Sequence, residues 1–484
     1  MSLGSRLARG AVLMVVLRWA SRALGLVSAM VLARLLSPAD FGLVAVALAV
    51  AALLEMVFDA SAETSLISRR SHDPGDWNTA WSIRVLSGLL IAVCLAAGGI
   101  IASIVYADQR YYLIFVMVGI ASAIQGFENI GVIAFRLDLD FERDAGYLLA
   151  CRVVSVMLTV ACAWTLRSYM AILVAGILAK AFQVAWSYRV QAFRPRWSLG
   201  RWRAFLGFSV WMLVLNIGKY LMLAFDRLLL ARFVSPQALG YYKVAADVSE
   251  LPVSEVVLPV ARTLGVGFAS VRHDAAQLGT MLRTSLGLVA LLIFPVSIGL
   301  MLVAEQFVAV LLGSQWGPAV PYVRMFVFFF MMQSLMHYCG TALIALERVR
   351  PYALVTIAHG FAFIALSLGL SRLQEVTWAF SIGRAAAAAS LTFAVWWLVR
   401  REGLIGARDF VAVVWRPLAA ALAMAVVVTR LDTSFGLALI DLTARAGVGA
   451  LVYVAMLLTL WLACGKPESP ERIVLRRLVP RLIR

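Results

Sequence analysis

Long runs of apolar residues, separated by short polar stretches, follow one another along the whole chain. A helix of about 20 apolar residues is long enough to cross a bilayer. Runs of this kind predict spans at residues 11–34, 41–62, 84–106, 112–134, 145–166, 169–189, 207–231, 239–261, 280–303, 320–346, 351–371, 375–399, 410–430 and 445–464. The pattern therefore predicts an all-α polytopic membrane protein with about 14 transmembrane helices.

One turn between apolar runs occurs twice. Residues 32–42 have the sequence LARLLSPADFG, and residues 230–240 have the sequence LARFVSPQALG. The offset is 198 residues without a gap, and six of the eleven positions are identical. In each copy an arginine ends one helix, Ser-Pro breaks it, and a glycine opens the next packed segment. The register of these residues indicates an internal duplication and predicts two similar lobes.

The number of spans in each copy predicts how the lobes are related. Six is an even number, so both lobes enter the membrane from the same side and the repeats are parallel. We therefore predict an N-terminal lobe over residues 1–193 and a basic interfacial connector over 194–206. A C-terminal lobe over 207–400, two further helices within 401–465 and a basic cytoplasmic tail over 466–484 complete the chain.

Composition supports a membrane protein. Hydrophobic residues make up 63% of the 484 positions and charged residues only 14%. A soluble domain with this balance would expose large apolar patches. The net charge of +17 would suggest nucleic acid in a soluble protein, but here the basic residues cluster in loops between apolar runs, so we expect no such partner. The five cysteines lie in or beside apolar runs without CxxC spacing, so we expect neither disulfides nor a metal site.

The distribution of basic residues among the loops predicts the orientation. The loops on the side of the N-terminus hold about three times as many Lys and Arg residues as the opposite loops, so both termini are predicted to be cytoplasmic. The connector alternates Arg194, Arg196, Arg201 and Arg203 with two tryptophans. This pattern suits anionic lipid headgroups, and the alternative is that these residues only hold the topology.

Four stretches together resemble a known family. They are the turn at 33–42, its second copy with the following tyrosines at 239–242, the segment 135–141 (FRLDLDF) and the loop 312–316 (LGSQW). In order and spacing they are similar to the polysaccharide transporter (Wzx-type oligosaccharide flippase) family. Its superfamily, the multidrug/oligosaccharidyl-lipid/polysaccharide exporters, also contains multidrug/toxin extrusion antiporters and the lipid II flippase.

This resemblance implies a two-lobed, V-shaped transporter of the cell inner membrane that works by alternating access. Its substrate would be a polyprenyl-diphosphate-linked oligosaccharide, which moves from the cytoplasmic to the periplasmic leaflet for exopolysaccharide, O-antigen or capsule export. Polysaccharide polymerase and chain-length or export proteins are the implied protein partners. The resemblance implies no cofactor.

Positive charges inside the apolar runs are candidates for binding the diphosphate, because such charges usually face a protein interior or a wet cavity. Arg18 and Arg22 share one face of the first span, and Lys219 lies on the equivalent span of the second lobe. A guanidinium can hold phosphate oxygens in a bidentate manner. The alternative is internal pairing, in which Lys219 or Arg22 neutralises Asp226 or Glu55. The remaining candidate cations are Arg152, Lys180 and Arg384.

Acidic residues in the same runs are candidates for ion coupling. A desolvated carboxylate has a raised pKa and can carry a proton or hold a sodium ion. For one of them the alternative is a simple ion pair, Lys243 with Asp247, four residues apart. The candidates are Glu55, Asp59, Asp226, Asp247 and Glu250.

The sequence lacks the residues that several enzyme classes need. There is no GxxxxGK[ST] loop for ATP hydrolysis, and the four histidines have no HExxH spacing. Asp138 and Asp140 have the spacing of a glycosyltransferase metal pair, but they lie in a short loop without a soluble domain around it, which favours solvated loop charges. We therefore expect a transporter rather than an enzyme. The alternative function is an ion-coupled small-molecule or multidrug extruder, which should have a more acidic cavity.

Overall fold

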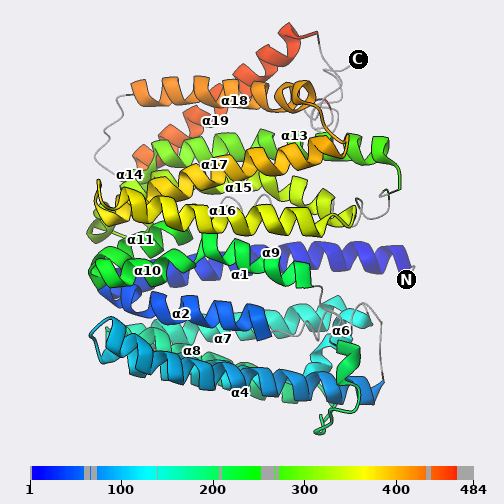
Figure 1. The fold of residues 1–484 in the computed structure, drawn as a ribbon, viewed down its shortest axis with the longest axis vertical. Coiled ribbons are helices and arrows are strands. Elements are labelled where there is room, and N and C mark those ends of the chain that lie inside the picture. Colours follow the sequence, from blue (N-terminus) through cyan, green and yellow to red (C-terminus); the bar gives the residue numbers. More distant parts are fainter. Residues whose placement is uncertain are drawn as a thin grey trace. The chain divides into compact units, whose positions relative to one another are not determined.

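The computed structural model describes residues 3–58, 66, 73–138, 140–205, 210–251, 268, 271, 273–431, 438–465 and 472, without the side chains of 3–16, 18, 141 and 204 (Figure 1). All regular secondary structure in these residues is helical, as predicted. The chain divides into two compact units. Unit 1 comprises Met1–Leu213 and Arg227–Gly240, and unit 2 comprises Val214–Asp226 and Tyr241–Arg484. The five-part division made from the sequence stays a prediction.

The described part of unit 1 consists mainly of long apolar helices. In it α4 packs along α5, and α7 packs along both α1 and α8. Asp73 caps α4 by accepting a hydrogen bond from the Gly75 amide at 2.7 Å, and Pro74 follows in the first turn. The elements are α1 (Leu3–Leu35), α2 (Pro38–Phe58), α4 (Pro74–Val105), α5 (Arg110–Gly126), η1 (Ile130–Ile133), α6 (Ala134–Leu137), α7 (Phe141–Leu166), α8 (Met170–Val190) and η2 (Trp202–Phe205).

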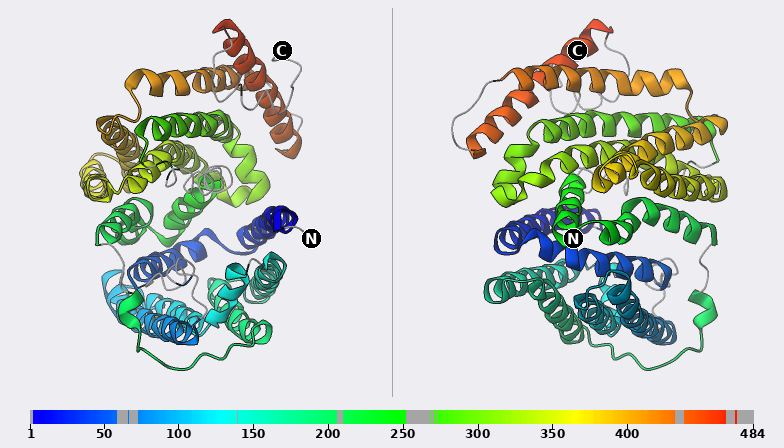
Figure 2. Two further views of the ribbon diagram at one scale, coloured as in Figure 1. Left: turned by 90° about the vertical axis from the view of Figure 1, so that its right-hand side faces the viewer. Right: turned by 60° about the vertical axis from the view of Figure 1, so that its left-hand side comes forward.

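Three helices, α9 (Val210–Leu223), α10 (Phe225–Phe233) and α11 (Pro236–Ser249), contribute residues to both units. In unit 2, α17 packs against α15 and α16, and α13 packs against α15 and α18. Figure 2 shows α19 crossing α18 steeply. The elements of this unit are α13 (Ala275–Leu302), α14 (Ala304–Leu311), η4 (Ser314–Ala319), α15 (Val320–Ala345), α16 (Val349–Leu370), α17 (Val376–Arg401), α18 (Ala407–Arg430) and α19 (Ala438–Ala463).

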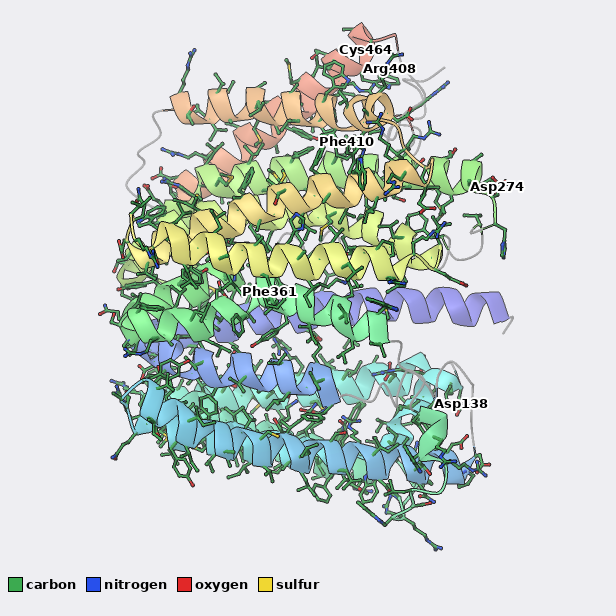
Figure 3. The ribbon with its side chains drawn as sticks, viewed as in Figure 1. Asp138, Asp274, Phe361, Arg408, Phe410 and Cys464 are labelled. Carbon is green, nitrogen blue, oxygen red and sulfur yellow. The ribbon has the colours of Figure 1, made fainter. Side chains whose placement is uncertain are left out.

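Each predicted span overlaps described helices, but the predicted number of spans is not confirmed. Among the described residues, 10 helices are long and apolar enough to cross a membrane. The number rises to 11 if Arg110–Gly126 and Ile130–Leu137, which are bent by 65°, form one broken span. Many large apolar side chains are exposed, among them Phe361 on α16 (labelled in Figure 3) with 60% of its surface accessible. The protein is therefore a multi-pass membrane protein whose span count of 14 stays a prediction.

The predicted span 207–231 is interrupted. The helix α9 ends at Leu223 and α10 begins at Phe225, so Ala224 lies at the break. The break places Asp226 in the first turn of α10. Interrupted helices of membrane proteins have free ends that can face polar groups within the bilayer.

The connector, as far as residue 205, is an extended strap that ends in η2 and is docked on α4. The Arg196 and Ser198 amides donate hydrogen bonds to α4 side chains at 2.8 and 2.9 Å. Arg201 forms ion pairs with Asp73 at 2.6 Å and Asp76 at 2.8 Å. The Arg201 hydrogen bond holds the pKa of the Asp73 carboxyl below its usual value. Polar contacts therefore fix the strap to the start of α4.

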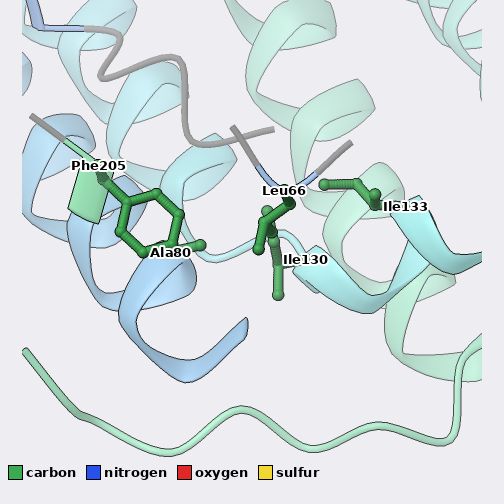
Figure 4. Packing of buried hydrophobic residues seen from close by; sticks show 5 residues of the cluster. All are labelled: Leu66, Ala80, Ile130, Ile133 and Phe205. Atoms are coloured by element: carbon green, nitrogen blue, oxygen red, sulfur yellow. The ribbon is translucent and has the colours of Figure 1, made fainter. Parts of the chain in front are cut away.

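An apolar cluster connects the start of α4 with η1 and η2 (Figure 4). Its five residues are all at most 5% exposed, and Trp77 and Phe193 pack around them with their rings edge-on at 5.0 Å. Because Phe205 belongs to this cluster, the end of the strap is packed against the core of unit 1. Its residues are Leu66, Ala80, Ile130, Ile133 and Phe205.

Candidate functional site

A buried carboxylate that the sequence analysis did not single out is the centre of a polar network in unit 1. Glu128, between α5 and η1, is only 4% exposed. Its Oε2 forms an ion pair with Arg84 of α4 at 2.5 Å. Its Oε1 accepts hydrogen bonds from the Tyr147 hydroxyl of α7 and from Gln183 Nε2 of α8, the latter at 3.0 Å. The network therefore joins α4, α7 and α8 through one carboxylate.

Lys180 lies beside this network. It is on α8, three residues before Gln183, and makes no hydrogen bond or ion pair with another described residue. Glu128, Glu55 and Arg84 are within electrostatic reach of its ammonium. Glu55 itself is exposed on α2. The structure therefore brings two of the predicted site residues, Lys180 and Glu55, into one charged region of unit 1.

Two further predicted cations of unit 1, Arg152 and Arg22, lie near each other. The Arg152 guanidinium of α7 packs against Gly25 of α1, and its Nε donates to the Ser21 carbonyl at 3.3 Å. Arg22 of α1 is near enough to repel it electrostatically. No ion pair joins Arg152 to a carboxylate within the described part of the chain. The structure thus places Arg22 and Arg152 together, and the side chain of Arg18 lies outside the described residues.

In unit 2, two residues predicted for different roles are bound to each other. Asp226 is 0% exposed and Arg384 is 1% exposed, and the two form an ion pair between α10 and α17. The Tyr242 hydroxyl donates to the same carboxylate oxygen at 2.5 Å. Asp226 is therefore neutralised by Arg384, and not by Lys219. Four aromatic rings surround the Arg384 guanidinium. Its Cζ lies 5.7, 4.9, 5.2 and 5.9 Å from the ring centres of Tyr242, Phe326, Phe329 and Phe363.

Lys219, the other predicted cation of unit 2, differs from Arg384 because it has no carboxylate partner among the described residues. It is on α9, two turns before Asp226, and its Nζ lies 5.8 Å from the centre of the Tyr352 ring. No hydrogen bond or ion pair connects it with another residue that the structure describes. An ammonium in such an apolar setting is costly unless an anion balances it. It lines a small cavity with Met222, Phe329, Gln333, Met336, Thr356, Ala388 and Leu391.

The other predicted acidic residues have simpler surroundings. Asp247 forms an ion pair with Lys243 at 2.5 Å, which confirms the pairing given as the alternative for it. Glu250 is exposed at the end of α11. Asp138 is exposed at the end of α6 (Figure 3), and Asp140 caps α7 by accepting the Arg143 amide at 3.1 Å. Asp59 lies outside the described residues.

Part of the missed network had a signal in the sequence. Glu128 and Arg84 lie in the predicted spans 112–134 and 84–106, so the criterion applied to the other charges would have selected them. Tyr147 and Tyr242 had no such signal, because a phenol is common in apolar runs and its hydrogen-bond partner depends on the tertiary structure.

Comparisons with known proteins agree with this architecture. The lipid II flippase MurJ in an inward closed conformation has the same fold, with a TM-score of 0.72 and 12% sequence identity over 94% of this chain and 99% of MurJ. The succinoglycan biosynthesis transport protein ExoT of Rhizobium meliloti is 25% identical over 481 residues, which cover 93% of this chain and 90% of ExoT. The lipopolysaccharide biosynthesis protein WzxC of Escherichia coli is 26% identical over 364 residues, or 70% of each chain.

A family model described as "Polysaccharide biosynthesis protein" matches residues 31–321, which include the first copy of the repeated turn, the second copy and the LGSQW loop. The match covers more than half of the chain. The family resemblance drawn from the four stretches is therefore confirmed, and the chain belongs to the polysaccharide biosynthesis protein family of membrane transporters.

Proposed function

We propose that this protein flips a polyprenyl-diphosphate-linked oligosaccharide from the cytoplasmic to the periplasmic leaflet of the cell inner membrane. The observation that carries the proposal is Lys219, a cation of an apolar helix that faces a cavity and has no carboxylate partner among the described residues. A diphosphate supplies the missing negative charge. The names of the relatives ExoT and WzxC, which refer to succinoglycan and lipopolysaccharide biosynthesis, support the saccharide class.

The residues that line the small cavity include one cation and no carboxylate, which favours an anionic group over a cationic drug as the partner of Lys219. Gln333 and Thr356 add hydrogen-bonding groups beside the Lys219 ammonium, and the remaining lining residues are apolar. A hydrogen bond to a charged group contributes about 1.5–3 kcal/mol, roughly 10- to 100-fold in affinity. In unit 1, Arg152 has no carboxylate partner among the described residues and offers a second anion-binding position, where its guanidinium can hold two phosphate oxygens at once.

The direction of transport depends on the orientation of the chain. The excess of Lys and Arg in one set of loops supports cytoplasmic termini. Reporter fusions placed after Pro38 and after Pro236 should then both report the periplasm, because the two copies of the turn are parallel. Opposite signals from the two fusions would contradict both the orientation and the parallel repeat.

Removal of the unbalanced cations should weaken export. We expect Lys219→Ala and Arg152→Ala each to lower surface-polysaccharide export by about 10-fold or more at matched protein levels, and the double variant to abolish it. Arg324→Ala is the matched control, because Arg324 is a cation of unit 2 that already pairs with Glu305 at 2.9 Å and is 44% exposed. Full export by the double variant would show that these cations are structural.

An assay with purified protein tests the substrate directly. In proteoliposomes, the parent protein should move a fluorescent lipid-diphosphate oligosaccharide between leaflets, and Lys219→Ala should do so at least about 10-fold more slowly. Inorganic diphosphate should compete with the substrate in the parent. Transport of small organic cations without transport of the lipid-linked saccharide would favour the multidrug extruder instead.

A further inference from the structure

The end of α17 combines two tryptophans with two arginines in matching order. Residues 396–401 have the sequence WWLVRR, so each arginine follows one tryptophan by four residues and lies one helical turn after it. The Cζ atom of Arg400 is 5.6 Å from the centre of the Trp396 ring. The Cζ atom of Arg401 is 4.8 Å from the centre of the Trp397 ring. Both guanidinium groups are therefore held over indole rings by cation–π contacts.

These two arginines are exposed and have no carboxylate partner among the described residues. The carboxylates that follow them in the chain are already bound. Glu402 forms an ion pair with Arg348 at 3.1 Å. In the first turn of α18, Asp409 forms an ion pair with Arg283 of α13 at 3.3 Å. A helix C-terminus carries only about half a negative charge, so the end of α17 keeps a net positive charge.

Aromatic packing fixes the position of this pair of arginines. The Trp396 ring contacts the rings of Phe393 on α17 and Phe410 on α18 (labelled in Figure 3), with ring centres 5.4 and 5.9 Å apart. Two helices therefore position the ring over which the Arg400 guanidinium lies. A side chain that is already restricted loses less conformational entropy when it binds a ligand.

The exposed side chains on this face of α17 change in polarity along the helix. Phe393, Trp397 and Arg401 are spaced by four residues and lie on one face. Phe393 is 64% exposed and Trp397 is 45% exposed. From the interior of the span toward its end, this face carries an apolar ring, an amphipathic indole and a guanidinium. A phospholipid has its acyl chains, glycerol esters and phosphate in the same order.

We propose that the end of α17 binds the headgroup of an anionic phospholipid. We call this position the tryptophan–arginine site (Trp396, Trp397, Arg400 and Arg401). Guanidinium groups can hold phosphate oxygens in a bidentate manner, and the predicted topology places the site at the cytoplasmic leaflet, where anionic lipids attract basic residues. The site does not rest on the proposed function, because lipid binding can be measured without transport.

Binding to the purified full-length protein in detergent tests the site. The protein is titrated with phosphatidylglycerol or with phosphatidylcholine of the same acyl chains, and bound lipids are counted by native mass spectrometry. The parent should bind its first phosphatidylglycerol at least about 10-fold more tightly than phosphatidylcholine, because charge-assisted hydrogen bonds hold the phosphate. The double variant Arg400→Gln with Arg401→Gln should lose this preference.

The matched control also removes two exposed arginines of unit 2. Arg372→Gln with Arg430→Gln changes arginines near the ends of α16 and α18, neither of which contacts a tryptophan ring among the described residues. This control should keep the preference of the parent for phosphatidylglycerol. Loss of the preference in the control as well would mean that net charge alone attracts the lipid, and would overturn the site.

A second variant keeps the charge and decides the matter if the glutamine variant does not insert. Arg400→Lys with Arg401→Lys preserves both positive charges, so the loop charge that orients the chain is unchanged. An ammonium is a point charge without the planar fork of a guanidinium. The affinity for phosphatidylglycerol should therefore fall by about threefold or more. An affinity equal to that of the parent would overturn the site.

The remaining outcomes identify the ligand. Equal affinity of the parent for phosphatidylglycerol and phosphatidylcholine would overturn an anionic-headgroup site. Displacement of the phosphatidylglycerol by an equal amount of a polyprenyl diphosphate would assign the arginines to the proposed substrate and overturn the phospholipid site. Preferential binding of phosphatidylglycerol by a parent protein that flips no lipid-linked saccharide would keep the site and reject the proposed function.

Discussion

Units 1 and 2 each bury a carboxylate that binds an arginine and a tyrosine hydroxyl, but they use it differently. In unit 1, Glu128 also binds Gln183 and lies within reach of Lys180, and its partner Arg84 still has 19% of its side chain exposed. In unit 2, Asp226 and Arg384 are enclosed by aromatic rings, at 0% and 1% exposure. The first network is open to further polar partners, whereas the second is closed.

This difference shows why counting buried charges is a poor guide to function. Asp226 is two turns from Lys219 on the chain, and its sequence position suggests that it could neutralise that lysine. Because Asp226 forms its ion pair with Arg384 instead, Lys219 remains without a carboxylate partner among the described residues. The choice of partner by one carboxylate therefore determines which cation remains available for the anionic substrate that we propose.

The closed pair of unit 2 should give the largest effect on stability. Asp226→Asn leaves the buried Arg384 guanidinium without its counter-ion, which typically costs about 3–5 kcal/mol in the free energy of unfolding. Thermal or denaturant unfolding in detergent measures the loss. The double variant Asp226→Leu with Arg384→Leu should recover most of it, because an apolar pair suits the surrounding rings. A neutral effect of Asp226→Asn would mean that water reaches the pair.

Loss of the carboxylate charge should lower the free energy of unfolding less in the open network of unit 1 than in the closed pair of unit 2. Glu128→Gln keeps the shape of the side chain and loses the charge that holds Arg84, so we expect a loss of about 1.5–3 kcal/mol. Arg84 can turn toward water, which limits the cost. Glu305→Gln is the control, since Glu305 is 65% exposed in its pair with Arg324 and should change stability by less than about 1 kcal/mol. A loss equal to that of Asp226→Asn would remove the distinction between the two networks.

The exposed ion pair at the connector should give the smallest effect, and that effect depends on pH. Arg201 holds the pKa of Asp73 below its usual value, so the contact stabilises the folded strap at neutral pH and is lost as the pH falls below about 4 and through the lowered pKa. Hydrogen exchange of the Arg196 and Ser198 amides, corrected for the intrinsic pH dependence, measures this.

In this experiment we expect exchange at the strap to rise at pH 3 by less than about fivefold, because exposed ion pairs contribute little. Arg201→Gln should show the raised exchange already at pH 6. Arg203→Gln serves as the control because Arg203 contacts the Trp202 ring, at 5.7 Å, rather than Asp73 or Asp76. Equal protection in the parent at both pH values would show that the backbone contacts alone hold the strap.

The helices could be predicted from the sequence because apolar runs of membrane length leave few alternatives. The predicted spans 351–371 and 375–399 correspond closely to Val349–Leu370 and Val376–Arg401. The break at Ala224 could not be predicted, because neither proline nor glycine lies there. We attribute it to tertiary contacts, since Asp226 directly after the break is bound by Arg384, 158 residues away in the sequence.

The candidate charges could be named from the sequence, but their partners could not. Arg384 and Asp226 both met the criterion of a charge in an apolar run, and the same criterion could not show that they bind each other. Periodicity defines the face of a helix, whereas pairing depends on which helices become neighbours. Repetition of the turn was visible in the sequence, but only the structure shows that its two copies touch, with Gly42 against Pro236 and Gly240 against Pro38.

That contact also constrains how the two halves of the gene can diverge. After a duplication, most positions of the copies are free to change independently, and five of the eleven positions in the turn now differ. Gly42 and Gly240 are not independent, because the backbone that excludes a side chain at one belongs to the other copy. A side chain at either glycine would therefore have to be accommodated by the backbone of the other half of the chain.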